Sequence, residues 1–82
     1  MARFTPNFDF AEAIGEKSLE IEAGTVKELL DYLKKKYPAE YNKNIQNVTI
    51  LVNGRNINYT GGKKTRLNPE DQVYFMLPGA GG

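Results

Sequence analysis

Residues 72–82 read Gln-Val-Tyr-Phe-Met-Leu-Pro-Gly-Ala-Gly-Gly, an apolar run that stops at a proline and continues as a glycine-rich end. Valine, tyrosine and phenylalanine favour a strand, and Pro78 ends its ladder because proline has no backbone N–H to donate. The glycines that follow have no side chain to bury. We therefore expect a last strand over residues 72–77, at the end of a domain comprising residues 1–77, and a flexible tail comprising residues 78–82.

Two interpretations of this tail are open. In the first interpretation the tail is a frayed terminus, which is common in proteins and is compatible with a glycine-rich sequence. The abrupt step from an apolar strand to Gly81-Gly82 favours the second interpretation, in which a thin chain without Cβ atoms enters a narrow channel. The reactive group would then be the carboxylate of Gly82 itself.

The clearest helix signal begins at Thr25. Thr25 and Glu28 have the spacing of a capping box, in which each side chain accepts from a backbone N–H at the helix start. Apolar residues then recur on one face until Pro38 ends the pattern, and lysines gather near the C-terminal end, where the helix dipole favours cations. The apolar face consists of Val26, Leu29, Leu30, Leu33 and Tyr37, and its leucines are expected to pack on Ile21, Ile50, Val52, Val73 and Phe75.

Four further strands are indicated on either side of this helix. Residues 18–22 alternate polar and apolar side chains, and residues 48–52 are a largely β-branched run. Asn53-Gly54 is the strongest short hairpin signal, because a type I′ turn needs positive φ at both central positions. Ala2–Thr5 and a return strand over residues 55–59 complete the set. The order predicts an α+β domain, with a mixed four- to five-stranded sheet and one main helix packed across it.

The connections carry weaker signals. In residues 7–15, Phe8, Phe10 and Ile14 are candidates to anchor a loop or a short helical turn against the core. Residues 39–47 are predicted to be irregular. The stretch 61–66 contains Gly-Gly-Lys-Lys-Thr, but it lacks the spacing of a phosphate loop, so we interpret its cations as a solvated surface.

The composition excludes several kinds of site. The 82 residues include no cysteine and no histidine, so there is no thiolate nucleophile or imidazole, and no metal site is expected. A formal charge of +1 favours neither nucleic acid nor an anionic membrane as a partner. No stretch is long enough to span a bilayer, and the first residues lack the apolar region of a signal peptide, so we expect a cytoplasmic protein.

The order of these features resembles the MoaD/ThiS family of ubiquitin-like sulfur carriers, and most closely MoaD, the small subunit of molybdopterin synthase. The features that carry the resemblance are Asn53-Gly54, residues 67–73 and Gly81-Gly82, and together they cover essentially the whole chain. The chain length and the long helix-to-strand segment favour MoaD over the shorter ThiS type. The resemblance implies the ubiquitin-like β-grasp fold.

The resemblance also implies a chemistry for the tail. In the family, an ATP-dependent adenylating enzyme of the MoeB or ThiF type activates the terminal glycine, here Gly82, which sulfur then converts to a thiocarboxylate. Pro78, Gly79, Ala80 and Gly81 would enter the partner's active site, where a MoaE-like catalytic subunit passes the sulfur to a pterin precursor. The chain is then a co-substrate rather than an enzyme, and binds no cofactor; the ATP is used by the activating enzyme.

Three classes of function stay open. The first is sulfur transfer in molybdenum or tungsten pterin cofactor synthesis. The second class uses the same acyl-adenylate for a different product. The sulfur would go to the thiazole of thiamine or to cysteine, or the tail would be joined to a lysine amine of a protein being modified. The third is a non-covalent β-grasp binding domain whose tail is incidental. Gly79 departs from the family pattern, because a larger apolar residue is usual there, and should leave the tail looser.

Strand alternation predicts a docking surface. If Leu77 and the alternate residues before it point into the core, Tyr74 and Met76 point outward, and by the same rule Leu51 points outward from residues 48–52. The β-grasp order that the resemblance implies places these two strands side by side. Single exposed apolar residues are ordinary, but a cluster more often marks an interface. We therefore expect Leu51, Tyr74 and Met76 to form an exposed apolar patch at the root of the tail, which would grip the activating enzyme and then the acceptor.

Overall fold

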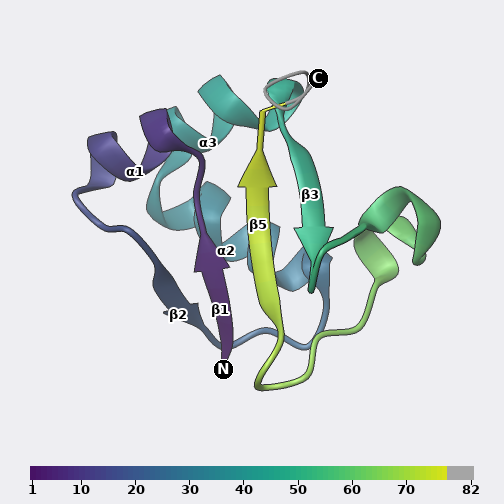
Figure 1. Cartoon of the computed structure of the whole chain (residues 1–82). Helices are drawn as coiled ribbons and strands as arrows, with labels where there is room; N and C mark the ends of the chain where they lie inside the picture. Colours follow the sequence, from purple (N-terminus) through teal and green to yellow (C-terminus); the bar gives the residue numbers. More distant parts are fainter. Residues whose placement is uncertain (78–82) are drawn as a thin grey trace.

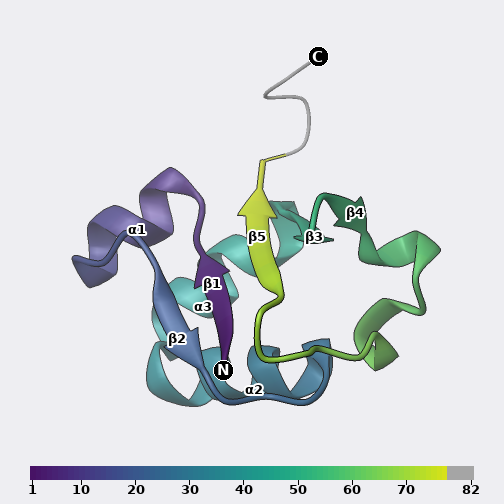
Figure 2. The same cartoon turned by 60° about the horizontal axis from the view of Figure 1, so that its bottom comes forward.

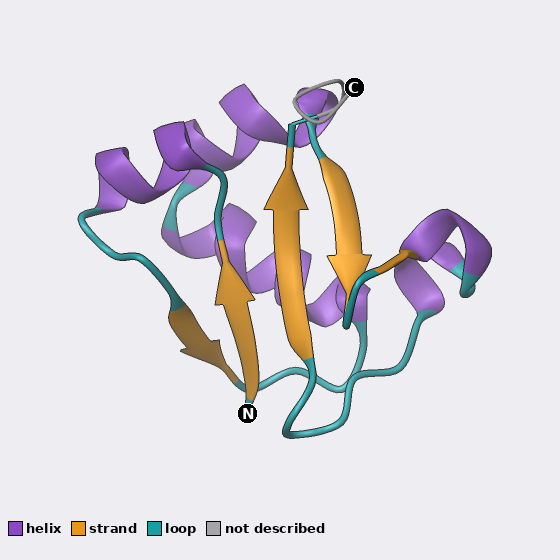
Figure 3. Ribbon diagram, viewed as in Figure 1, coloured by secondary structure: helices purple, strands orange, loops and turns teal. Residues whose placement is uncertain are grey.

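The computed structural model describes residues 1–77, so the predictions made for residues 78–82 lie outside it. The described chain forms a sheet with helices packed against one face, as Figures 1 and 2 show from two directions. The strands, orange in Figure 3, are β1 (Ala2–Thr5), β2 (Leu19–Ile21), β3 (Thr49–Val52), β4 (Arg55–Asn56) and β5 (Gln72–Met76). The helices are α1 (Phe8–Ile14), α2 (Val26–Lys36) and α3 (Pro38–Asn44), with short 3₁₀ turns at Ile45–Asn47, Ile57–Tyr59 and Gly62–Lys64.

The sheet is mixed, with the strand order β2-β1-β5-β3-β4. Its central strand, β5, runs parallel to β1 and antiparallel to β3. The edge strands β2 and β4 each pair antiparallel with their neighbour. Five strands with α2 packed across them confirm the predicted α+β arrangement.

The apolar face of α2 forms the centre of the core. Leu29, Leu30 and Leu33 are between 0% and 2% exposed. Burial of one leucine side chain contributes roughly 2 kcal/mol, so this face is a main source of stability. The expected sheet partners, Ile21, Ile50, Val52, Val73 and Phe75, all belong to the same buried cluster.

An aromatic cluster completes the core beside α1. The ring of Phe4 meets that of Phe75 edge to face at a centroid distance of 4.8 Å, and Phe10 lies 5.8 Å from Phe4. Phe4 and Phe10 have no exposed surface. The cluster joins β1, β5 and α1, three elements that are separated in the sequence.

Helix α2 begins as predicted, with one difference in its cap. The N–H of Glu28 donates to Thr25 Oγ1 at 3.2 Å, as a capping box requires. The Glu28 carboxylate, however, accepts from the N–H of Gly24 at 2.8 Å, one residue before the cap. Both side chains still satisfy backbone donors that the helix leaves without partners.

The hairpin between β3 and β4 is the one that Asn53-Gly54 predicts. Val52 pairs with Arg55, which leaves a two-residue turn. The φ angles of Asn53 and Gly54 are 52° and 84°, positive at both positions as the turn requires.

The prediction that residues 39–47 are irregular is wrong. Pro38 does end the pattern of α2, but it also opens α3, because a proline at the first helical position loses no hydrogen bond. Tyr41 and Asn44 are buried on α3, and Ile45 packs against the core from the turn that follows. The polar composition hid this short helix because few of its residues reach the core.

Two smaller expectations are also wrong. Phe8 is 73% exposed, because it lies two residues before the buried Phe10 and so on the opposite side of α1. The return strand predicted over residues 55–59 is only Arg55–Asn56, after which Ile57 turns into the core within a 3₁₀ turn.

Candidate functional site

The predicted tail begins at the central strand of the sheet. β5 ends at Met76 and is hydrogen-bonded to β1 on one side and to β3 on the other. A strand paired on both sides is held in place, so the root of the tail is fixed relative to the domain. The residues predicted to react or to enter a partner's site, 78–82, lie outside the described residues, and their roles stay predictions.

The predicted docking residues Leu51, Tyr74 and Met76 lie on the sheet face opposite the helices. Burial alternates along β5, which turns Tyr74 and Met76 away from the core. Leu51 on β3 is the direct cross-strand partner of Tyr74. Leu51 and Tyr74 are half-buried, whereas Met76 is 49% exposed. The structure thus brings the three residues, here called the docking patch, together beside the end of β5.

Leu77 does not point into the core as predicted. It is 41% exposed and lies one residue beyond the end of β5. Alternation holds only while the ladder continues, and Pro78 removes the next backbone donor. Pro78 is therefore the sequence signal that the alternation ends before Leu77. The outcome is additional apolar surface at the root of the tail.

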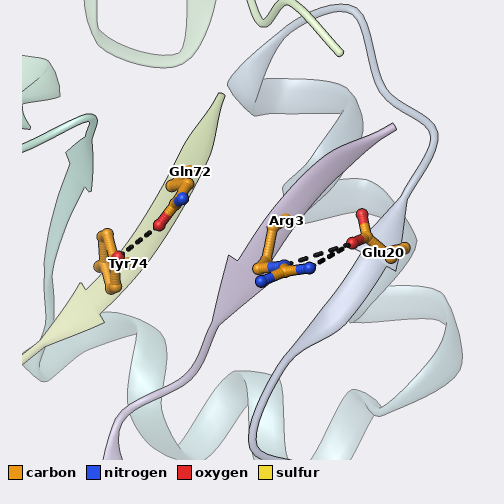
Figure 4. Close-up of polar contacts among 4 residues, drawn as sticks. All are labelled: Arg3, Glu20, Gln72 and Tyr74. Atoms are coloured by element: carbon orange, nitrogen blue, oxygen red, sulfur yellow. Dashed lines mark hydrogen bonds and ion pairs between the residues drawn. The ribbon is translucent and has the colours of Figure 1, made fainter. Parts of the chain in front are cut away.

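Polar side chains continue the same face toward β1 and β2 (Figure 4). The guanidinium of Arg3 contacts the carboxylate of Glu20 at 3.2 Å, and the Tyr74 hydroxyl lies 2.6 Å from Gln72 Oε1, to which it donates. The ion pair contributes little to stability, because both side chains are more than half exposed. The face therefore changes from apolar near the tail root to polar at β2.

Neither a metal site nor a membrane-spanning helix is present in the described part of the chain. Within residues 1–77, no three acidic side chains are grouped so that they could hold a metal ion. In the same part of the chain, no helix combines the length and apolar character needed to cross a membrane. The described residues thus form a domain with a partly exposed apolar cluster next to the end of its central strand.

Comparison with known proteins gives one family and several similar structures. The ThiS family model matches residues 4–82. No curated protein sequence matches the chain. The solution structure of small archaeal modifier protein 1 from Methanosarcina acetivorans is similar with 26% identity and a TM-score of 0.81, over 99% of this chain and 95% of that one.

Two further structures share the fold at lower identity. CysO of Mycobacterium tuberculosis is 17% identical with a TM-score of 0.81, over 94% of this chain and 98% of that one. A chain of the BexX/CysO complex of Amycolatopsis orientalis is 19% identical with a TM-score of 0.83, and both chains are covered over 100% of their length.

Sheet order, helix placement and these similarities define a ubiquitin-like β-grasp protein of the sulfur-carrier and modifier class. The chain belongs to the ThiS family, which confirms the resemblance drawn from Asn53-Gly54, residues 67–73 and Gly81-Gly82.

Proposed function

We propose that the chain is a sulfur carrier whose Gly82 carboxylate is adenylated and then converted to a thiocarboxylate. The main support is the family match, which extends through the glycine pair to Gly82. A second support is the position of the tail root, which follows the fixed central strand and not a loop. A rigid root lets a partner hold the domain while the tail reaches its active site.

The chemistry asks only for an acyl group from this chain. One carboxylate oxygen of Gly82 attacks the α-phosphate of ATP, and pyrophosphate leaves. Sulfide then attacks the acyl carbon, and AMP leaves with the oxygen, so the carboxylate becomes a thiocarboxylate. If a persulfide supplies the sulfur, its attack first gives an acyl disulfide, and a thiol of the activating or donor protein then cleaves the S–S bond, releasing the thiocarboxylate and forming a disulfide. An adenylating enzyme of the MoeB or ThiF type would supply the catalytic groups, which agrees with a chain without cysteine or histidine.

For the sulfur acceptor we propose the pterin precursor of the molybdenum or tungsten cofactor, delivered through a MoaE-like subunit. The support is the long helix-to-strand segment, which includes α3 and the turn at Ile45–Asn47 and is the feature that favours the MoaD type. Transfer to a lysine amine of another protein is the second candidate. The 26% identity to a small archaeal modifier protein favours it.

The docking patch would contact both partners in turn. Leu51, Tyr74 and Met76 lie beside the tail root, so a protein bound there is also positioned to receive the tail. One of the similar structures is itself a complex that contains CysO.

The experiment that tests the carrier function is mass spectrometry of the intact protein. Incubated with its cognate adenylating enzyme, ATP and a sulfur source, the chain should gain the mass of one oxygen replaced by sulfur. Removal of Gly82 should abolish the gain and leave the circular dichroism spectrum unchanged, because glycine has no side chain to pack and the described core cluster lies within residues 2–75. Undiminished thiocarboxylate formation in the truncated chain would contradict the proposal.

The acceptor is tested in a second step. Thiocarboxylated protein mixed with a MoaE-like subunit and the pterin precursor should lose its sulfur and return to the carboxylate. If the chain instead becomes joined to lysine side chains through an isopeptide bond, the modifier function is correct and the pterin acceptor is wrong.

A further inference from the structure

The Gly-Gly-Lys-Lys-Thr stretch lies next to the start of α2. Lys63, Lys64 and Arg66 line an open cleft of about 510 Å³ together with residues at the start of α2. In Figures 1 and 2, the segment near residue 65 and the start of α2 lie beside each other, away from the end of β5 where the tail begins. The cleft is thus separate from the docking patch.

The loop is held by an internal network rather than left free. Thr65 Oγ1 lies 2.7 Å from the carbonyl oxygen of Gly62 and 3.0 Å from Thr60 Oγ1. Two backbone hydrogen bonds of 2.9 Å join the loop to the helix start, one from Val26 N–H to the carbonyl of Thr65 and one from Leu67 N–H to that of Gly24. Because these bonds fix the loop backbone, the Cα positions from which the surface side chains extend are fixed as well.

Four cations line the cleft against one carboxylate. Lys27, Lys63, Lys64 and Arg66 oppose Glu28, a formal net charge of +3, which becomes +2 when Asp31, the partner of Lys27, is included. Lys27 is paired with Asp31 at 2.8 Å, but no ion pair within residues 1–77 involves Lys63, Lys64 or Arg66. Holding like charges together raises the free energy of the free protein, and a bound anion would offset that repulsion.

Three backbone donors at the helix start are already occupied. The N–H groups of Gly24, Val26 and Glu28 donate to Glu28 Oε1, the Thr65 carbonyl and Thr25 Oγ1. A single phosphate group would find few directed donors here. Several long cationic side chains around an open cleft suit a ligand with several spaced negative charges.

We propose that this cleft docks an acidic, aspartate- or glutamate-rich segment of a partner protein. The inference does not depend on the proposed sulfur chemistry, since the cleft and the tail root are at different places on the domain. A partner bound at Lys63, Lys64 and Arg66 would leave the docking patch and the tail accessible. The attraction is mainly Coulombic, so it should weaken as salt rises.

The test is an NMR titration of the full ¹⁵N-labelled chain with acetylated hexaglutamate, and separately with inorganic phosphate. We expect the peptide to shift the amide signals of residues 24–28 and 61–66, and to bind less tightly as sodium chloride increases. The double variant Lys63→Glu/Lys64→Glu should lose at least about tenfold in affinity. Lys34→Glu/Lys35→Glu is the matched control, because it makes the same charge change on exposed residues at the other end of α2 and should retain most of the affinity.

Three results would overturn the proposal. Equal losses in the two double variants would mean that the peptide responds only to net charge. Shifts spread over the lysines of α2 and α3 would show that no defined site exists. Phosphate binding tighter than the peptide would assign the cleft to a small anion instead.

Discussion

Asn53 connects two parts of the sheet through its side chain as well as through its turn. Its Nδ2 donates to Asp71 Oδ1 at 2.8 Å, and its Oδ1 accepts from the N–H of Gln72 at 2.9 Å. Asp71 in turn accepts from the N–H of Asn68 at 2.8 Å. The β3–β4 hairpin is thereby tied to the start of the central strand. The sequence predicted the two turns separately, but not the bonds between them, because these join residues 18 and 19 positions apart.

Two glycine substitutions separate backbone strain from crowding. A Cβ at Gly54 would meet nothing within 4 Å, but the φ of 84° is unfavourable for alanine, so Gly54→Ala should destabilise the protein by about 1–2 kcal/mol. Gly24→Ala is the control, because its φ is not positive and its Cβ would make only an ordinary contact of 3.5 Å with Glu28 Oε1. Urea denaturation measures both. Equal losses of stability would mean that the turn geometry at Gly54 is not the cause.

At the scale of elements, α2 was predictable and α3 was not. α2 carries a cap, an apolar face and a cationic C-terminal turn, and each signal is local to the segment. α3 buries only Tyr41 and Asn44, and the Nδ2 of Asn44 donates to the Glu40 carbonyl at 2.8 Å. Asn7 Nδ2 also donates to Asn44 Oδ1 at 3.0 Å, so the position of α3 depends on a residue far away in the sequence.

The core face of α2 gives a stability prediction. Truncating Leu30 or Leu33 to alanine should lower the free energy of unfolding by about 2–5 kcal/mol, because each change removes buried surface and leaves a cavity. Such a loss is a large fraction of the roughly 5–15 kcal/mol that stabilises a typical domain. Lys34→Ala, an exposed change in the same helix, should be nearly neutral. Guanidinium denaturation showing a loss below about 1 kcal/mol for Leu33→Ala would refute the assigned packing.

At the scale of the whole molecule, we expect binding to both partner proteins to depend on the docking patch. Met76→Asp or Leu51→Asp should leave the fold intact, because both side chains lie on the outer face of the sheet. Binding to the adenylating enzyme and to the acceptor subunit should each weaken at least about tenfold, or about 1.4 kcal/mol. The affinity falls because the new carboxylate would lose its water on binding and lie unpaired in an apolar contact, which costs free energy.

Isothermal titration calorimetry measures this loss, with Asn58→Asp as the control. Asn58 is exposed, lies outside the sheet and gives the same change in charge. Wild-type affinity of Met76→Asp for both partners would place the docking surface elsewhere on the domain.

Features that depend on neighbours along the chain could be predicted from the sequence alone. These are α2 with its cap, the two-residue turn at Asn53-Gly54 and the alternation within β5. Each arises from backbone preference or from side-chain periodicity within about ten residues, so no tertiary contact is needed to infer it.

Features that join distant segments needed the folded structure. The docking patch was expected from the resemblance, but the register that pairs Leu51 with Tyr74 and the exposure of Leu77 depend on how the strands align and where the paired ladder stops. The bridge between Thr25 and Arg66 brings the loop cations to the start of α2. Thr25 and Arg66 are 41 positions apart, and their contact depends on how the sheet and helices pack together rather than on any local preference.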